Sequence, residues 1–257
     1  MQASDATRRF SDRVADYLRW RPSYPAEVLD FLVAQCGLTR DWTIADIGSG
    51  TGLLSRLFLD HGNRVFGVEP NREMREAAEQ LFADNALFTS VAGSAEETTL
   101  GARCVELVGA GQAFHWFDPD RAHAELARIL KPGGWVTLIW NDRRKTSTPF
   151  LRAYEELLLT WATDYREVDH SRLGRAEIES FFGAAGILDT EFENRQSFDF
   201  EGLAGRLLSS SYAPATGHPS HEPMIESLRS IFDTHQADGQ VTFEYDTRVY
   251  LGHLSAE

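Results

Sequence analysis

The chain contains few cysteines and no long hydrophobic run. Only two cysteines, Cys36 and Cys104, occur in 257 residues, too few for a disulfide scaffold, and this favours a reducing compartment. No stretch approaches the roughly 18 apolar residues of a membrane-spanning helix. The first twenty residues carry charges throughout and lack the apolar region of a secretory signal. We therefore expect a cytoplasmic protein without a membrane segment.

Basic residues are outnumbered by acidic ones. Lys and Arg total 25, against 39 Asp and Glu, and the formal net charge is −14. Because nucleic acids attract proteins through clustered Lys and Arg, we expect no nucleic-acid partner. Hydrophobic residues make up 42% of the chain, which is enough for a sizeable core and disfavours global disorder.

Short β-rich runs alternate with longer helical patterns from Trp42 onward. This alternation is typical of a mostly parallel sheet with helices on both of its faces. After Thr148 the pattern changes to helices that precede and follow a strand-like alternation, and it ends in a β region that is either one strand or two. The predicted strands cover residues 43–47, 64–69, 87–91, 105–109, 135–140, 190–200 and 241–251, and the predicted C-terminal helices cover residues 149–164, 202–211 and 221–235.

A glycine-rich turn, Asp46-Ile47-Gly48-Ser49-Gly50-Thr51-Gly52, lies between a predicted strand and a predicted helix. Glycines permit positive φ and let a ligand approach the backbone closely. Glu69 ends the second predicted strand, 17 residues beyond Gly52, where a carboxylate can accept hydrogen bonds from both hydroxyls of a ribose. Together they predict a nucleoside cofactor across the carboxyl ends of the first two strands.

The spacing of the glycines distinguishes between cofactors. The dinucleotide-binding pattern is G-x-G-x-x-G, whereas this turn reads G-x-G-x-G and places Leu53 where that pattern has its last glycine. The spacing therefore disfavours NAD and FAD. A turn that merely connects a strand to a helix remains the alternative interpretation.

Three segments resemble class I S-adenosylmethionine-dependent methyltransferases. ADIGSGTGLLSRLFLDHGNRVFGVEP resembles motif I and the acidic loop, GSAEETTL resembles the segment after strand three, and GQAFHWFDPDRAHAELARILKPGGWVTLIW resembles strands four and five with their joining helix. The similarity is greatest to small-molecule methyltransferases of the type 11 and trans-aconitate methyltransferase-like group, over about Phe10 to Asn141. It departs at Val105-Glu106, where the family often has an aspartate, and this leaves the start of strand four uncertain.

The resemblance implies a Rossmann-like α/β fold, with a seven-stranded, mostly parallel sheet and helices on both faces. It implies a single methyltransferase domain over residues 1–257, in which residues 1–24 form an N-terminal lid segment. Residues 42–141 would form the cofactor-binding core, and residues 148–257 would supply the acceptor-side helices and the last strands. The methyl acceptor would be a small molecule, although the sequence specifies neither the acceptor nor the oligomeric state.

The same resemblance implies S-adenosylmethionine as cofactor and S-adenosylhomocysteine as product. The backbone of Gly48, Ser49 and Gly50 would contact the methionine moiety. Asp46 would brace the turn or reach the amino group through water, and Glu69 would hold the ribose. The other cofactor contacts would be Pro70 or Asn71, Ala95 and Glu96 near the adenine, and Gln112, Ala113 and His115 near the methyl-donor end.

His115 is the candidate catalytic residue. Methyl transfer from a sulfonium is an in-line displacement in which alignment of the acceptor supplies much of the rate, so a general base is optional. The ordinary pKa of histidine suits proton transfer near neutral pH, and His115 follows the fourth strand. Alternatively, His115 packs within its loop. Its neighbour Trp116 is a candidate substrate contact.

Further candidate residues lie outside the core. Tyr17 and Arg21 in the lid segment are predicted to bind the cofactor, Arg21 by pairing with the methionine carboxylate. The alternative is a surface helix with solvated arginines. Tyr24, Arg143 and Tyr212 are predicted substrate contacts. Arg143 could meet an anionic acceptor or belong to a solvated charge run with Arg144 and Lys145.

The sequence also offers one weak metal-binding pattern and two alternative functions. His218 and His221 form an H-x-x-H pattern, but no cysteine or third histidine stands nearby, and zinc sites want three or four ligands. We therefore predict no metal site. The competing functions are a nicotinamide-dependent oxidoreductase on a related sheet and a non-catalytic protein that binds an adenosyl ligand.

Overall fold

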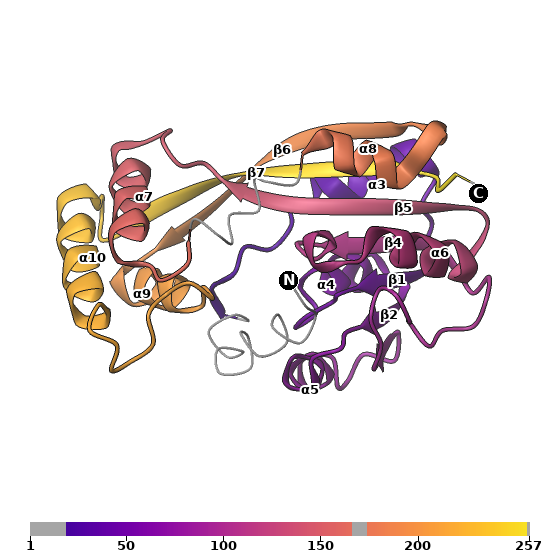
Figure 1. The fold of residues 1–257 in the computed structure, drawn as a ribbon, viewed down its shortest axis with the longest axis horizontal. Coiled ribbons are helices and arrows are strands. Elements are labelled where there is room, and N and C mark those ends of the chain that lie inside the picture. The colour runs from indigo at the N-terminus through magenta and orange to yellow at the C-terminus, as the bar shows by residue number, and fades with distance from the viewer. Residues whose placement is uncertain (1–18, 166–173, 256–257) are drawn as a thin grey trace.

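The computed structural model describes residues 19–165 and 174–255. Within them, seven strands form one sheet in the order β3-β2-β1-β4-β5-β7-β6, flanked by helices (Figure 1). This mostly parallel sheet confirms the expected fold class. The strands are β1 Thr43–Ile47, β2 Arg64–Val68, β3 Phe88–Val91, β4 Val105–Gly111, β5 Leu130–Arg143, β6 Ile187–Phe198 and β7 Val241–Gly252.

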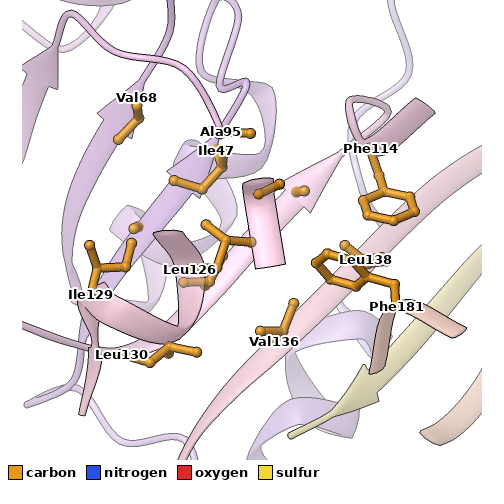
Figure 2. Close-up of a cluster of buried hydrophobic side chains, with 14 of the residues drawn as sticks. Ile47, Val68, Ala95, Phe114, Leu126, Ile129, Leu130, Val136, Leu138 and Phe181 are labelled. Carbon is orange, nitrogen blue, oxygen red and sulfur yellow. The ribbon is translucent and has the colours of Figure 1, made fainter. Parts of the chain in front are cut away.

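Helices cover both faces of the parallel half of the sheet. One core cluster joins the strands to α3 (Glu27–Cys36), α4 (Leu53–His61) and α5 (Arg72–Leu81), with Phe58 fully buried at its centre. The other joins them to α6 (Pro119–Ile129) and α8 (Arg175–Phe182), where Leu126 and Phe181 pack on the strands (Figure 2). Strands covered on both faces read as continuous hydrophobic runs, which is why their pattern was recognisable.

Side-chain caps determine where several helices begin. The Asn71 carboxamide oxygen accepts a hydrogen bond from the Met74 amide at 2.9 Å and starts α5. Asp118 caps α6 in the same way, with a proline at the first helical position. Thr148 caps α7 (Pro149–Trp161), which again begins with proline. Each of these helices follows a strand of the sheet, namely β2, β4 and β5.

β5 is longer than the sequence predicted. The pattern predicted a helix ending at Pro132-Gly133-Gly134 and a strand over residues 135–140, whereas β5 begins at Leu130. Leu130 pairs with Val105, and the next pair is Trp135 with Leu107. The residues between Leu130 and Trp135 therefore form a bulge in which Gly133 has a φ of +76°. The start of β4, left uncertain by the sequence, lies at Val105 opposite this bulge.

The last β region is a single strand. β7 pairs antiparallel with β5 on one side and with β6 on the other. The long strands β5, β6 and β7 extend past the parallel half of the sheet, and α7, α9 (Phe200–Leu208) and α10 (His221–His235) gather around that end (Figure 1). We call these three helices the C-terminal lobe. They share a third core cluster with the strand ends, including Phe243 of β7.

Most of the expected lid segment, including Tyr17, lies outside the described residues. Its last part, before α3, is bound to the sheet. The Asn194 carboxamide donates to the Ser23 carbonyl oxygen at 2.7 Å, and the Asn141 carboxamide donates to the same oxygen at 3.3 Å. Among the described residues, no helix has the length and apolar character needed to cross a membrane.

Candidate active site

The glycine turn leaves no room for a side chain at Gly48 or Gly52. Gly48, Gly50 and Gly52 have φ values of 66°, 56° and 89°, in the left-handed region that L-residues adopt at a cost. A Cβ atom on Gly48 would lie 2.6 Å from the Ala113 Cβ, and one on Gly52 would lie 2.4 Å from the Phe82 ring. Packing on both sides of the turn therefore requires glycine.

Hydrogen bonds hold the turn against the end of β2. The amides of Gly48 and Ser49 both donate to the Val68 carbonyl oxygen, at 2.9 and 3.1 Å, and the Gly50 amide donates to Glu69 Oε2 at 2.9 Å. These donors are used within the protein. A dinucleotide-binding turn instead directs its amides at a pyrophosphate, so the geometry disfavours the nicotinamide alternative.

The Glu69 carboxylate joins the turn to the start of α5. Its second oxygen accepts a hydrogen bond from the Asn71 amide at 2.8 Å, and the residue is only 7% exposed. Burial raises the pKa of Glu69, against the opposing effects of these two hydrogen bonds and of Arg75. Each carboxylate oxygen has lone pairs beyond its one backbone bond, so the group is both oriented and able to accept further hydrogen bonds.

Asp46 is fully buried below the turn. Its Oδ2 accepts a hydrogen bond from the Ser55 hydroxyl at 2.6 Å, while Oδ1 has no hydrogen-bond partner among the described residues. Burial raises the pKa of Asp46 to about 7, and the hydrogen bond from Ser55 only partly offsets this effect. A buried carboxyl with an unused oxygen is suited to a cationic ligand group, which would stabilise its ionised form.

The end of β4 presents His115 and Trp116. Gln112 adopts a φ of +58°, uncommon for a residue with a side chain, and its amide donates to the Ile139 carbonyl oxygen at 2.9 Å. The short helix η2 (Phe114–Trp116) follows. Phe114 anchors it by packing its ring edge-to-face on Phe181, with centroids 4.6 Å apart (Figure 2). The backbone strain and this anchor position the two neighbouring rings.

A cavity of about 350 Å³ connects the glycine turn with the C-terminal lobe. It brings together predicted residues from the first segment, the turn, the end of β4, the end of β5 and the loop after α9. Those that line it are Arg21, Tyr24, Asp46, Gly48, Ser49, Gly50, Gln112, His115, Trp116, Arg143 and Tyr212.

The remaining predicted residues that the structure describes lie outside this lining. Glu69, Pro70 and Asn71 lie beyond the turn at the end of β2, where the Asn71 side chain caps α5. Ala95 is buried at 4% exposure, and Glu96 accepts a hydrogen bond from the Asp118 amide at 2.9 Å. Ala113 packs beneath Gly48. None of these residues lines the cavity.

Sequence reasoning missed several residues that line the cavity. They come from elements whose mutual placement depends on the antiparallel pairing of β5 and β7. One local signal was available, because Arg206 interrupts the apolar face of α9 that contains Leu203 and Leu207. Among the missed residues are Asn141, Asp142, Lys145, Tyr165, Arg206, Tyr245 and Asp246.

His218 and His221 are engaged within their own loop. The His218 Nδ1 atom accepts a hydrogen bond from the Ser220 amide at 3.1 Å, and the His221 Nδ1 atom lies 2.9 Å from the Pro214 carbonyl oxygen. Neither imidazole is directed at the cavity lining.

Part of the chain is similar in sequence to known methyltransferases. Residues 45–138 match the family model described as a methyltransferase domain. An uncharacterized methyltransferase of Mycobacterium tuberculosis is 38% identical over 139 residues, which cover 54% of each chain. An uncharacterized methyltransferase of Schizosaccharomyces pombe is 33% identical over 152 residues, which cover 59% of each chain. The chain thus spans only about half the length of these curated relatives.

Solved structures share the fold across nearly the whole chain. A candidate type II methyltransferase from Anaeromyxobacter dehalogenans aligns with a TM-score of 0.68 and 21% identity, covering 92% of this chain and 99% of that one. A candidate methyltransferase of an antibiotic biosynthesis pathway from Anabaena variabilis aligns with a TM-score of 0.59 and 18% identity, covering 92% and 99%. Residues 45–138 therefore match a methyltransferase domain, and the chain has the class I methyltransferase fold.

Proposed function

We propose that the protein transfers the methyl group of S-adenosylmethionine to a small-molecule acceptor. One observation carries this proposal. The glycine turn is closed onto Glu69 on one side and opens on the other into a cavity lined by residues of the C-terminal lobe. This arrangement, within a methyltransferase domain, offers a nucleoside site and an acceptor site that meet at the turn.

The residues around the turn fit the proposed cofactor. S-adenosylmethionine would supply a methyl group already activated on a sulfonium. The bare backbone of Gly48, Ser49 and Gly50 would contact the methionine moiety, because a Cβ on Gly48 has no space. The buried, unused Oδ1 of Asp46 is suited to the cationic amino group, directly or through water, and Glu69 would accept hydrogen bonds from the ribose.

The remaining cofactor contacts would come from loops on either side of the turn. The adenine would lie near Pro70 or Asn71 and the segment that contains Ala95 and Glu96. The methyl-donor end would lie near Gln112 and Ala113, where the strained backbone after β4 meets the cavity. Arg21, whose guanidinium donates to the Ser209 carbonyl oxygen at 3.0 Å, would pair with the methionine carboxylate from the cavity side.

The acceptor would occupy the part of the cavity between η2 and the C-terminal lobe. Tyr24, Trp116, Arg143 and Tyr212 line it and would orient the acceptor for in-line attack, which requires alignment more than acid–base chemistry. His115 lines the same cavity and is the candidate general base. The covering lobe would limit access of water to the transfer site.

Calorimetric titration with S-adenosylhomocysteine and with NAD tests the proposed cofactor. We expect binding of the former and none of the latter; the reverse result would restore the nicotinamide alternative. Incubation with methyl-labelled S-adenosylmethionine and metabolite extracts then tests transfer. Binding without labelled product from any extract would indicate a non-catalytic adenosyl-binding protein instead.

A further inference from the structure

We propose that the methyl acceptor carries an anionic group, a carboxylate or a phosphate, that binds Arg143 and Arg206 at the lobe end of the cavity. The inference rests on the proposed methyl transfer and specifies its substrate class. The lobe end holds the buried arginines Arg143 and Arg206. Two aspartates, Asp142 and Asp246, also line the cavity, but they pair with Arg248 and Arg144.

Arg143 ends β5 with its side chain only 10% exposed. Its Nη2 atom pairs with Glu155 and also donates to the Tyr165 hydroxyl at 3.1 Å. Its Nη1 atom is buried without a hydrogen-bond partner among the described residues. Arg143 lines the cavity, so a buried donor of a charged group is available there.

Arg206 projects from α9 into the same part of the cavity and is 6% exposed. It donates to the Tyr245 hydroxyl at 3.4 Å and to the Ser210 hydroxyl at 3.2 Å. Within the part of the chain that the structure describes, no carboxylate lies within ion-pair distance of it. Burying a guanidinium is unfavourable unless a counter-charge compensates for the lost hydration, and an anionic ligand would provide that compensation.

The two arginines line the same part of the cavity. Tyr245, which contacts Arg206, is the cross-strand partner of Arg143 in the β5–β7 pairing. Burial raises the pKa of Tyr212, but the nearby charges of Arg206, Arg21 and Arg143, together with a hydrogen bond with Ser210, outweigh burial and lower the pKa below its usual value. Glu155 pairs with Arg143 and offsets its charge. Arg206 has only hydroxyl partners among the described residues, so its charge is the one that an anionic ligand would offset.

The position of the arginines orients the acceptor. α9, which carries Arg206, lies well apart from α4, which follows the glycine turn (Figure 1). The anionic group would therefore be held at the lobe end while the methyl-accepting atom points toward His115 and the turn. Arg21 would remain with the cofactor carboxylate. Guanidinium groups suit this task because they bind carboxylate and phosphate through paired donors.

Charge fractionation of a metabolite extract tests the proposal. The wild-type protein and methyl-labelled S-adenosylmethionine are incubated with whole extract, with extract depleted on an anion exchanger and with extract depleted on a cation exchanger. We expect labelled product from the whole and the cation-depleted extracts, and its loss from the anion-depleted one. Transfer that survives anion depletion overturns the proposal. No transfer from whole extract, although S-adenosylhomocysteine binds, overturns the proposed methyl transfer as well.

Substitutions separate acceptor binding from cofactor binding. For Arg206→Gln, we expect the KM for the eluted anionic fraction to rise about tenfold or more, as for other buried charge pairs that lose one partner. The affinity for S-adenosylhomocysteine should stay unchanged. Arg175→Gln is the matched control, because neither Arg175 nor its partners Glu179 and Asp189 line the cavity. Equal KM values in both variants, or a loss of S-adenosylhomocysteine affinity in Arg206→Gln alone, contradict the assignment.

Phosphatase treatment of the active fraction, after it is eluted from the anion exchanger, distinguishes a phosphate from a carboxylate. Treatment with a phosphatase before incubation should abolish transfer if the acceptor is a phosphate monoester and leave it unchanged if the acceptor is a carboxylate. Should Arg206→Gln fail to fold, Arg143→Gln provides the same comparison from β5.

Discussion

Alanine substitutions at two glycines of the turn separate backbone strain from steric overlap. Gly48 and Gly50 both have left-handed φ values, 66° and 56°, so each substitution costs roughly 1–2 kcal/mol in backbone conformation alone. Their surroundings differ. A Cβ on Gly50 would lie 3.7 Å from the Met74 sulfur, an ordinary contact, whereas a Cβ on Gly48 would lie 2.6 Å from the Ala113 Cβ.

Overpacking adds about 1–3 kcal/mol to the cost of Gly48→Ala only. We therefore expect Gly50→Ala to lower the free energy of unfolding by about 1–2 kcal/mol and Gly48→Ala to lower it by about 2–5 kcal/mol. Urea denaturation at 25 °C, followed by circular dichroism, measures both. The reasoning would be refuted if the two variants were equally stable, or if Gly48→Ala were as stable as the wild type.

The remaining predictions concern Asp46 and His115. In the folded protein the pKa of Asp46, about 7, lies above its ordinary value of 3.8. The free energy of unfolding is therefore highest below about pH 4, where Asp46 is protonated in both states. It falls by up to about 4 kcal/mol as the pH rises to about 7. Asp46→Asn should remove this pH dependence, so the free energy of unfolding of the variant should rise relative to that of the wild type between about pH 5 and pH 8. A difference between the two proteins that stays constant across that range contradicts the assignment. His115→Ala should slow turnover much more than it weakens S-adenosylmethionine binding, as measured by steady-state kinetics and calorimetry. Unchanged turnover would remove His115 from the mechanism.

The parallel half of the fold was predictable because its determinants are local. The strands are covered on both faces and therefore read as short apolar runs, and the turn at Gly48 carries its conformational requirement in its own residues. The position of Glu69 follows from β2 lying parallel beside β1. The seven-stranded sheet was expected from the family resemblance.

The lobe end of the cavity was not predictable in the same way. Arg206 and Tyr245 are 39 residues apart, and their contact depends on how α9 packs on the end of β7. Arg143 was identified as a candidate, but its burial was not, because a run of three basic residues is typical of solvated surface. The structure separates them: Arg143 is buried, whereas Arg144 pairs with acidic side chains nearer the surface.

The bulge in β5 shows a third kind of difference. Pro132, Gly133 and Gly134 end helices by local preference, and the sequence therefore predicted a break. Pairing of Leu130 with Val105 ahead of the bulge is a contact between strands, and no local pattern indicates it.

A crystal structure of the complex with S-adenosylhomocysteine tests the central claim most directly. The account predicts that the Glu69 carboxylate accepts hydrogen bonds from the two ribose hydroxyls while it keeps its bonds to the Gly50 and Asn71 amides, and that the methionine portion lies on the bare backbone at Gly48. A ribose bound elsewhere, with Glu69 in contact only with those two amides, would contradict it.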